Sequence, residues 1–196
     1  GRLYIANHAA RAVLALDPAT GAMVLPSQAV AGATGHLLKP QYAQEALYVG
    51  DSAGALWRLD RELQKPPEKI FDGEKNASCT GLIVSETADA AFAGLARQGQ
   101  PHALCALNMD GAKRWEVAAG VPLAYHAGYL FVHTGRALEA RRAADGGLVA
   151  TVDAAETDGR LPLTEIAGVA VAGLDGEDRL YVLGNGQIRV YRLRRP

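Results

Sequence analysis

A short apolar motif of four residues, called here the repeat tetrad, returns five times along the chain. Its copies are Leu3-Tyr4-Ile5-Ala6, Leu47-Tyr48-Val49-Gly50, Ala91-Phe92-Ala93-Gly94, Leu130-Phe131-Val132-His133 and Leu180-Tyr181-Val182-Leu183. The copies begin about 44, 44, 39 and 50 residues apart, a spacing that excludes the period of a helical hairpin repeat. A polar or glycine-containing turn and a second apolar strand follow each copy. The pattern therefore predicts a series of similar β-sheets.

The rest of each repeat divides into a leading and a trailing strand, which gives four strands per unit. Turns such as Asp17-Pro18-Ala19-Thr20-Gly21, Ala144-Asp145-Gly146-Gly147 and Leu183-Gly184-Asn185-Gly186 tolerate the positive φ angles of tight hairpins. Even the alanine-rich segment 88–96 falls where a strand is due. We therefore predict an all-β chain, a β-propeller of about five four-stranded antiparallel blades. Residues 1–196 form one domain or fragment, with approximate units 1–32, 33–75, 76–120, 121–165 and 166–196.

The two terminal units are incomplete in this division. The first lacks its leading strand and the last lacks its trailing strand, so the two sets overlap and do not complete one blade. Open sheet edges are templates for further strands. We therefore expect the C-terminal part of a longer propeller, whose missing neighbour or a second copy pairs with the open edges. A closed five-bladed ring with irregular end blades is the alternative.

Composition and charge narrow the class of protein. The 196 residues are 49% hydrophobic and 21% charged, an ordinary globular composition. A net charge of -1 supplies no positive field for duplex nucleic acid, and the basic stretch Arg192-Leu193-Arg194-Arg195 reads as a solvated tail. No apolar run approaches the roughly 18 residues that cross a bilayer. We expect neither a nucleic-acid partner nor a membrane span.

Packing roles account for most of the aromatic residues, the small residues and the cysteines. Trp57, Trp115, Phe71 and Tyr48 are predicted to fill the wider space between blades. Small residues, as in the segment 168–173, allow the inner strands to approach near the axis. Cys79 and Cys105 fall on the first and third strands of one blade, about 9.5 Å apart, which is too far for a disulfide. We expect two free thiols.

The segment Ala15-Leu16-Asp17-Pro18-Ala19-Thr20-Gly21 resembles the A-L-D-x-x-T-G signature of the PQQ-like, or quinoprotein, β-propeller repeat. In that family a Trp commonly stands four residues after the Gly, where this chain has Leu25. The segment from Ala106 to Trp115 resembles the same motif, one residue shorter, and keeps the Trp. The motif is structural, because its Asp or Asn caps the turn, its Gly supplies the unusual φ and its Trp docks between blades. A quinoprotein dehydrogenase of this family would need a full ring with a metal site and a carboxylate base, and the adjacent cysteine pair of many such enzymes is absent.

Candidate chemistry is sparse. His8, His36, His102, His126 and His133 show no metal-binding spacing, although His126 and His133 flank a hairpin and could approach each other. The simpler interpretation is one turn histidine and one strand histidine. The acidic residues Asp175, Glu177 and Asp178 resemble a calcium loop but lack the length of an EF-hand, so a solvated turn is favoured. We assign no catalytic, cofactor-binding or metal-binding residue and expect no cofactor.

These observations predict a non-enzymatic scaffold that presents loops to a protein or peptide partner. The family resemblance implies a periplasmic or cell-envelope protein of a bacterium, of the kind that assists outer-membrane protein assembly. We expect the residues that contact the partner to be exposed on connecting loops. The candidates are His8, Arg11, Tyr42, Arg97, His102, Arg136 and Arg160. The alternatives are part of a quinoprotein dehydrogenase, a metal-dependent lactonase-like enzyme, or a regulatory or sensor domain. Convergence of acidic, Asn or His side chains at the axis would favour an enzyme.

Overall fold

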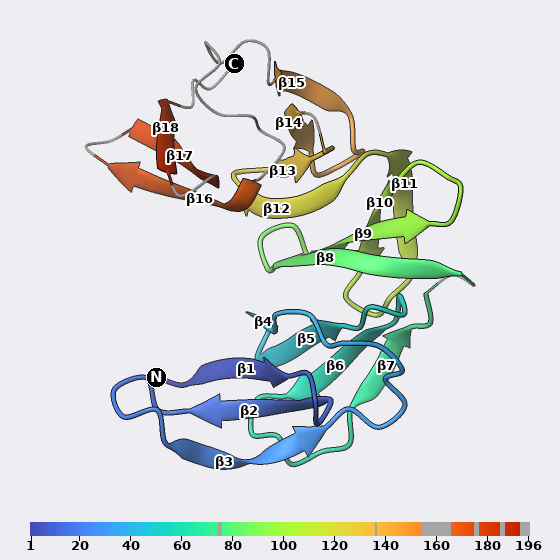
Figure 1. The fold of residues 1–196 in the computed structure, drawn as a ribbon, viewed down its shortest axis with the longest axis vertical. Helices are drawn as coiled ribbons and strands as arrows, with labels where there is room; N and C mark the ends of the chain where they lie inside the picture. Colours follow the sequence, from blue (N-terminus) through green and yellow to red (C-terminus); the bar gives the residue numbers. More distant parts are fainter. Residues whose placement is uncertain (74–75, 136, 154–165, 175–176, 185–186, 193–196) are drawn as a thin grey trace.

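The computed structural model describes residues 1–73, 76–135, 137–153, 166–174, 177–184 and 187–192. This part of the chain consists of strands, turns and connecting loops, without an α-helix. The strands form five antiparallel sheets, which we number I to V in chain order (Figure 1). The all-β prediction is therefore confirmed. Within the same residues no helix is long and apolar enough to cross a membrane.

Each sheet is a meander in which every strand pairs with the next strand along the chain. Sheets I and V have three strands, and sheets II, III and IV have four. Sheet I contains β1 (Leu3–Asn7), β2 (Ala12–Leu16) and β3 (Met23–Ala29). Sheet II contains β4 (Gln41–Ala43), β5 (Ala46–Gly50), β6 (Leu56–Asp60) and β7 (Glu68–Phe71). Sheet III contains β8 (Ala77–Ser85), β9 (Ala90–Arg97), β10 (Ala103–Asn108) and β11 (Lys113–Ala118). Sheet IV contains β12 (Val121–His126), β13 (Tyr129–His133), β14 (Ala137–Arg142) and β15 (Leu148–Asp153), and sheet V contains β16 (Ile166–Leu174), β17 (Glu177–Gly184) and β18 (Gln187–Arg192).

The turns have the structure that their sequences predict. Asp17 Oδ1 accepts hydrogen bonds from the N–H groups of Ala19 and Thr20, at 2.8 and 3.0 Å. Gly21 then takes φ 71°, a left-handed conformation that glycine adopts without strain. Asp145 caps a second such turn by accepting from the N–H of Gly147 at 2.8 Å. The Asp of the repeat signature is thus a turn residue that orders the hairpin.

The hydrophobic core is divided among the joints between successive sheets. Four clusters of buried side chains fill the joints I/II, II/III, III/IV and IV/V. The first and third residues of the tetrad point toward the preceding sheet, and the second points toward the following one. In sheet II, Leu47 and Val49 belong to the I/II cluster and Tyr48 belongs to the II/III cluster. In sheet IV, Leu130 and Val132 pack on sheet III while Phe131 packs on sheet V.

The predicted packing roles hold for the aromatic residues. Trp57 and Tyr48, exposed by 4% and 1%, are buried in two different joints, and Phe71 packs on the II/III cluster. Trp115 packs in the III/IV joint and donates its indole N–H to the carbonyl of Ala143 at 3.1 Å. Leu25, which replaces the signature Trp in sheet I, packs in the I/II joint.

Close approach of inner strands requires glycine in the III/IV joint. The leading strands β4, β8, β12 and β16 contact one another in succession. A Cβ atom added at Gly81 of β8 would lie 2.6 Å from Val121 Cγ1, and one at Gly94 would lie 2.8 Å from Pro122 Cδ. A Cβ at Gly168 of β16 would meet no atom within 4 Å. The prediction that small residues permit close approach is therefore correct for sheet III, while Gly168 has room for a side chain.

The leading strand of the second unit differs from its prediction. It was expected from about His36, but β4 spans Gln41–Ala43 and an isolated bridge joins Leu37 to Asp51. Residues 36–38 nevertheless pair with residues 50–52, because the Leu38 N–H donates to the carbonyl of Gly50 at 2.7 Å and the Ser52 N–H donates to that of His36 at 2.8 Å. Pro40 has no N–H to give to a strand ladder, so the predicted strand is divided into this short pairing and β4. Both cysteines are free and buried, on β8 and β10, with β9 between them as expected.

Candidate functional site

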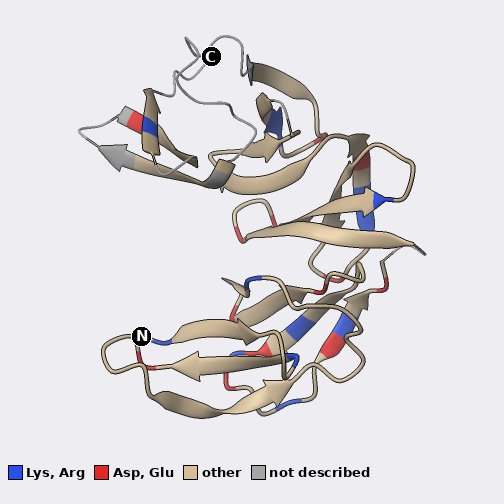
Figure 2. Ribbon diagram, viewed as in Figure 1, with Lys and Arg blue, Asp and Glu red and all other residues tan. Residues whose placement is uncertain are grey.

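Most of the exposed large apolar side chains among the described residues lie on the two end sheets, and the others are Tyr42 on sheet II and Leu148 and Val149 on sheet IV. Large hydrophobic residues with high exposure include Leu3, Met23 and Val24 on sheet I and Leu183, Ile188 and Val190 on sheet V. The strands of sheet I read LYIAN, AVLAL and MVLPSQA, without an acidic or basic residue. Figure 2 shows these three strands without charged residues, while charged residues lie on turns and on strands of the other sheets, sheet V included. Neighbouring exposed apolar side chains of this kind are typical of an interaction surface.

Sheet I has one packed face and one free face. On the packed face Val13 and Ala15 are buried against sheet II. The other face is called here the free face of sheet I. It contains the cross-strand neighbours Leu3–Leu16, Ile5–Leu14 and Leu16–Met23. Leu3 and Met23 on this face are 50% and 62% exposed. Three adjacent strands thus present a continuous apolar surface that no described residue covers.

Sheet V has the same construction at the other end of the chain. Leu180 and Val182 are buried against sheet IV. The opposite surface is called the free face of sheet V. It contains the cross-strand neighbours Tyr181–Val190 and Leu183–Ile188. Ile188 is 67% exposed and Val190 52%. Sheet V therefore also ends the array with an apolar surface.

The free faces lie at opposite ends of an open array of sheets (Figure 1). Each described cluster joins two successive sheets, and none joins sheets I and V. The strand edges are open as well, because β5, β9, β13 and β17 each pair with a leading strand whereas β1 is the edge strand of sheet I among the described residues. This arrangement agrees with the predicted open edges and not with a closed ring of five sheets.

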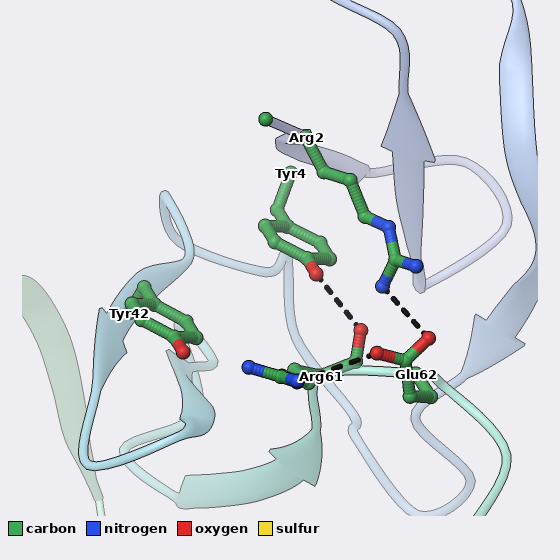
Figure 3. Close-up of a pocket in the computed structure, with 6 residues that line it drawn as sticks. Arg2, Tyr4, Tyr42, Arg61 and Glu62 are labelled. Atoms are coloured by element: carbon green, nitrogen blue, oxygen red, sulfur yellow. Dashed lines mark hydrogen bonds and ion pairs between the residues drawn. The ribbon is translucent and has the colours of Figure 1, made fainter.

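A pocket of about 440 Å³ lies beside β1, between sheets I and II (Figure 3). It is lined by Gly1, Arg2, Tyr4, Tyr42, Arg61 and Glu62. The Tyr4 hydroxyl donates to the carbonyl of Arg61, and Arg2 Nη1 donates to Glu62 Oε2, both at 2.8 Å. Arg61 is paired with Glu45 and Glu62. Because these charges balance, the pocket offers aromatic contact area rather than a binding site for one charged ligand.

The contact residues predicted from loop exposure do not form one site. Tyr42 is 48% exposed and lines the pocket beside β1. Arg11 Nη1 donates to the carbonyl of Ala33 at 3.0 Å, and Arg97 Nη2 donates to Glu116 at 2.6 Å. The ring of His8 meets that of His36 edge-on, and the carbonyl of His102 accepts from the N–H of Ala119. Arg136 and Arg160 lie outside the described residues. Of the described candidates, Tyr42 lies at a pocket and the arginines Arg11 and Arg97 are held by neighbouring residues.

The histidines also remain apart. His126 pairs with Tyr129 at one end of the β12–β13 hairpin and His133 pairs with Val121 at the other end, so the idea that they approach each other was wrong. His126 Nε2 lies 3.2 Å from Asp178 Oδ2, which joins sheets IV and V. Asp175 and the side chain of Glu177 lie outside the described part of the chain. In the part that is described, no three His, Cys, Asp or Glu side chains are placed to hold a metal ion.

Two ionisable groups in sheet III have strongly shifted pKa values. Burial raises the pKa of the Cys79 thiol to about 11, so it is protonated at neutral pH and a poor nucleophile. Hydrogen bonds from Lys113 and then Arg97 lower the pKa of Glu116 to about 2. The Cys105 thiol also donates to Glu116, at 3.5 Å. These shifts come from packing and ion pairing within one sheet.

The free faces are the candidate functional surfaces that loop-based reasoning missed. Their signal was present in the sequence, because a strand with one solvated face normally alternates apolar and polar residues. The segments LYIAN and AVLAL are apolar at nearly every position, which is typical of a sheet covered on both faces. The sequence therefore predicts two buried faces for sheet I, and no described residue covers one of them.

No model of a known family matches the chain, and no curated protein sequence matches it. Solved structures do match. Quinohemoprotein alcohol dehydrogenase from Comamonas testosteroni aligns with 100% of this chain and 42% of its own at 14% identity, with a TM-score of 0.61. BamB from Moraxella catarrhalis aligns with 98% of this chain and 56% of its own at 19% identity and a TM-score of 0.56. BBS1N, solved in complex with ARL6DN, aligns with 99% of this chain and 61% of its own at 16% identity and a TM-score of 0.68.

These likenesses show the fold, a β-propeller of antiparallel sheets similar to those of the quinohemoprotein and BamB structures. The chain spans between 42% and 61% of the length of these three proteins.

Proposed function

We propose that this protein is a non-enzymatic scaffold, a section of a PQQ-like β-propeller whose end sheets bind protein. The observation that carries the proposal is the pair of apolar free faces on sheets I and V. Water-exposed apolar area costs roughly 25 cal/mol per Å², so a face with several large exposed side chains gains free energy when a partner covers it. Such a surface suits a protein or peptide partner, which can cover several strands at once.

The chemistry of the free faces supports a proteinaceous partner. The free face of sheet I is built from Leu, Ile and Met, and that of sheet V from Tyr, Leu, Ile and Val together with Arg179, which lies on the same face as Tyr181. Their apolar side chains pack against other apolar side chains and offer little specificity to a small polar ligand. The Tyr4–Tyr42 pocket adjoins β1 and adds aromatic contact area of the kind that anchors interfaces. The likeness to BBS1N, a propeller solved in complex with ARL6DN, agrees with such a role.

A bacterial periplasm or cell envelope is the compartment that this proposal includes. It rests on the PQQ-like turn signature and on the family resemblance that this signature carries. Fractionation of the source cells, with an antibody against the chain, tests the compartment. Recovery in the periplasmic or membrane fraction is expected, and recovery in the cytoplasm contradicts this part of the proposal.

Selection from a displayed library of random peptides tests protein binding without a known partner. The chain is immobilised at low density, so that copies do not meet, and peptides are enriched on it. We expect apolar or aromatic peptides whose binding is lost in the double variant Met23→Asp/Ile188→Asp. A matched control is Leu148→Asp, because Leu148 is 52% exposed on β15 and belongs to neither free face.

The proposal fails if no peptide is enriched, or if the enriched peptides bind the double variant as well as they bind the unaltered chain. Thermal melts of all variants accompany the selection. Because Met23 and Ile188 are largely exposed, we expect the variants to stay folded.

A further inference from the structure

The direction of the tetrad side chains gives every sheet a polarity. In sheets II, III and IV the first and third tetrad residues lie in the cluster shared with the preceding sheet, and the second lies in the cluster shared with the following one. In sheet III, for example, Ala91 and Ala93 pack toward sheet II and Phe92 packs toward sheet IV. Each joint therefore brings the following face of one sheet against the preceding face of the next.

The free faces obey the same rule. Leu3 and Ile5 are the first and third tetrad residues of sheet I, so its free face is of the preceding type. Tyr181 is the second tetrad residue of sheet V, and Leu180 and Val182 are buried in the IV/V joint. The free face of sheet V is therefore of the following type. The two uncovered surfaces are the two halves of one joint of the repeat.

We infer that a second copy of this chain occupies these faces head to tail, with the free face of sheet V in one copy packed on the free face of sheet I in the other. This inference rests on the proposed function, in which the end faces bind protein, and it names the partner. A second copy is the occupant because this chain itself carries both required halves. The contact continues the stacking seen in the four described joints, with Tyr181, Leu183, Ile188 and Val190 against Leu3, Ile5, Leu14, Leu16 and Met23.

The polarity of the sheets also argues against a symmetrical contact between two copies. A symmetrical contact between two sheets I would place two preceding faces together, and no described joint in the chain has that form. The strands of sheet I carry no charged residue, so Arg179 on the free face of sheet V meets no like charge on them in the head-to-tail contact. A heterologous contact of this kind closes into a ring or grows into longer assemblies, and each outcome contains the same joint.

Light scattering on the unaltered chain and two single-face variants tests the inference. The unaltered chain is expected to have the mass of two or more copies of 20.6 kDa. Met23→Asp blocks the free face of sheet I, and Ile188→Asp blocks that of sheet V. Each variant alone is expected to fall to the monomer mass, because one half of every joint is then defective.

Mixing the two variants in equal amounts tests the polarity. The Met23→Asp chain keeps a working sheet V and the Ile188→Asp chain keeps a working sheet I, so one joint forms and a two-chain species returns. Leu148→Asp, the matched control on β15, is expected to keep the mass of the unaltered chain. Circular dichroism confirms that each variant is folded.

The inference is overturned by an unaltered chain that stays monomeric at every concentration, by a single-face variant that keeps the full mass, or by a mixture that does not recover. A variant that keeps its full mass would indicate a symmetrical contact. These outcomes differ from failure of the proposed function. A monomer that binds displayed peptides at its end faces would support the proposed function and contradict the head-to-tail contact. An oligomer whose single-face variants bind no peptide would support the head-to-tail contact and contradict the proposed function.

Discussion

Sheets III and V are built from the same repeat, yet they differ in how much of each sheet is covered. In β10 of sheet III five of the six residues are buried. In β18 of sheet V, Ile188 and Val190 are more than half exposed. Phe92 and Tyr181 hold the same tetrad position, but Phe92 is fully buried while Tyr181 lies on a free face. The repeat therefore sets which side chains point outward from a sheet, and a neighbouring sheet decides whether they are buried.

The largest expected effect is a difference in stability cost between alanine substitutions at Phe92 and at Tyr181. Phe92 stacks on Tyr125, with ring centroids 6.1 Å apart, and contacts Trp115. Phe92→Ala should lower the free energy of unfolding by about 3–5 kcal/mol, because it leaves a cavity in a closed joint. Tyr181→Ala should cost roughly 1 kcal/mol in the monomer, because Tyr181 is only partly buried and no described sheet packs on its face. Urea denaturation of both variants measures the difference, and equal losses would contradict the open end at sheet V.

A second contrast concerns the acidic turn residues of an inner and an end sheet. Asp51 is 1% exposed, and its carboxylate accepts from the N–H groups of Ala53 and Ala55 and from the Trp57 indole, at 2.9, 3.1 and 3.3 Å. Asp51→Ala should cost about 2–4 kcal/mol, since buried donors lose their acceptor. Asp17→Ala removes a solvent-exposed cap in sheet I and should cost less. Thermal melts of the two variants rank them, and the reverse order would show that the end sheet holds more of the stability.

Acid sensitivity should distinguish sheet III from sheet I. Glu116 has a pKa of about 2, below its ordinary value of 4.5, because Lys113 and Arg97 donate to it. Its stabilising contribution is therefore present above pH about 4.5 and is lost as the pH falls toward 2. Glu116→Gln should cost about 1 kcal/mol at neutral pH after solvent screening, and the difference from the unaltered chain should vanish near pH 2.

Urea unfolding at a series of pH values measures this difference. A constant cost across the range would mean that the Glu116 side chain acts through packing and not through charge. The strands of sheet I carry no acidic or basic residue, so they add nothing to this dependence.

The smallest expected effect is on thiol accessibility and involves no change in stability. Cys79 and Cys105 are buried in the II/III joint, and the pKa of Cys79 is raised to about 11. Neither thiol should react with a disulfide reagent until the chain is unfolded. A thiol introduced by Ile188→Cys on the free face of sheet V should react at once in the monomer. Rapid labelling of Cys79 or Cys105 in the folded protein would contradict a closed inner joint.

Much of the fold was predictable because strand repeats are encoded locally. The tetrads, the Asp-capped turns and the apolar second strands identified the sheets, and the missing strands of the first and last units were visible in the spacing. The pairing that leads into sheet II begins near His36 as predicted, but its division at Pro40 into a bridge and β4 was not predicted. The candidate site was predicted less well. Loop exposure nominated residues such as Arg11 and Arg97, whose side chains turn out to be held by neighbouring groups.

The sequence by itself determined the strands, their turns and the two faces of each sheet, because alternation along a strand and turn chemistry act between near neighbours. The tertiary structure alone decided which faces are covered, because burial depends on which sheets stack against each other. Leu47 and Leu3 hold the same tetrad position, and no property of their local sequence separates them. Leu47 is buried against sheet I, whereas Leu3 faces the open end of the array, where no described sheet precedes it.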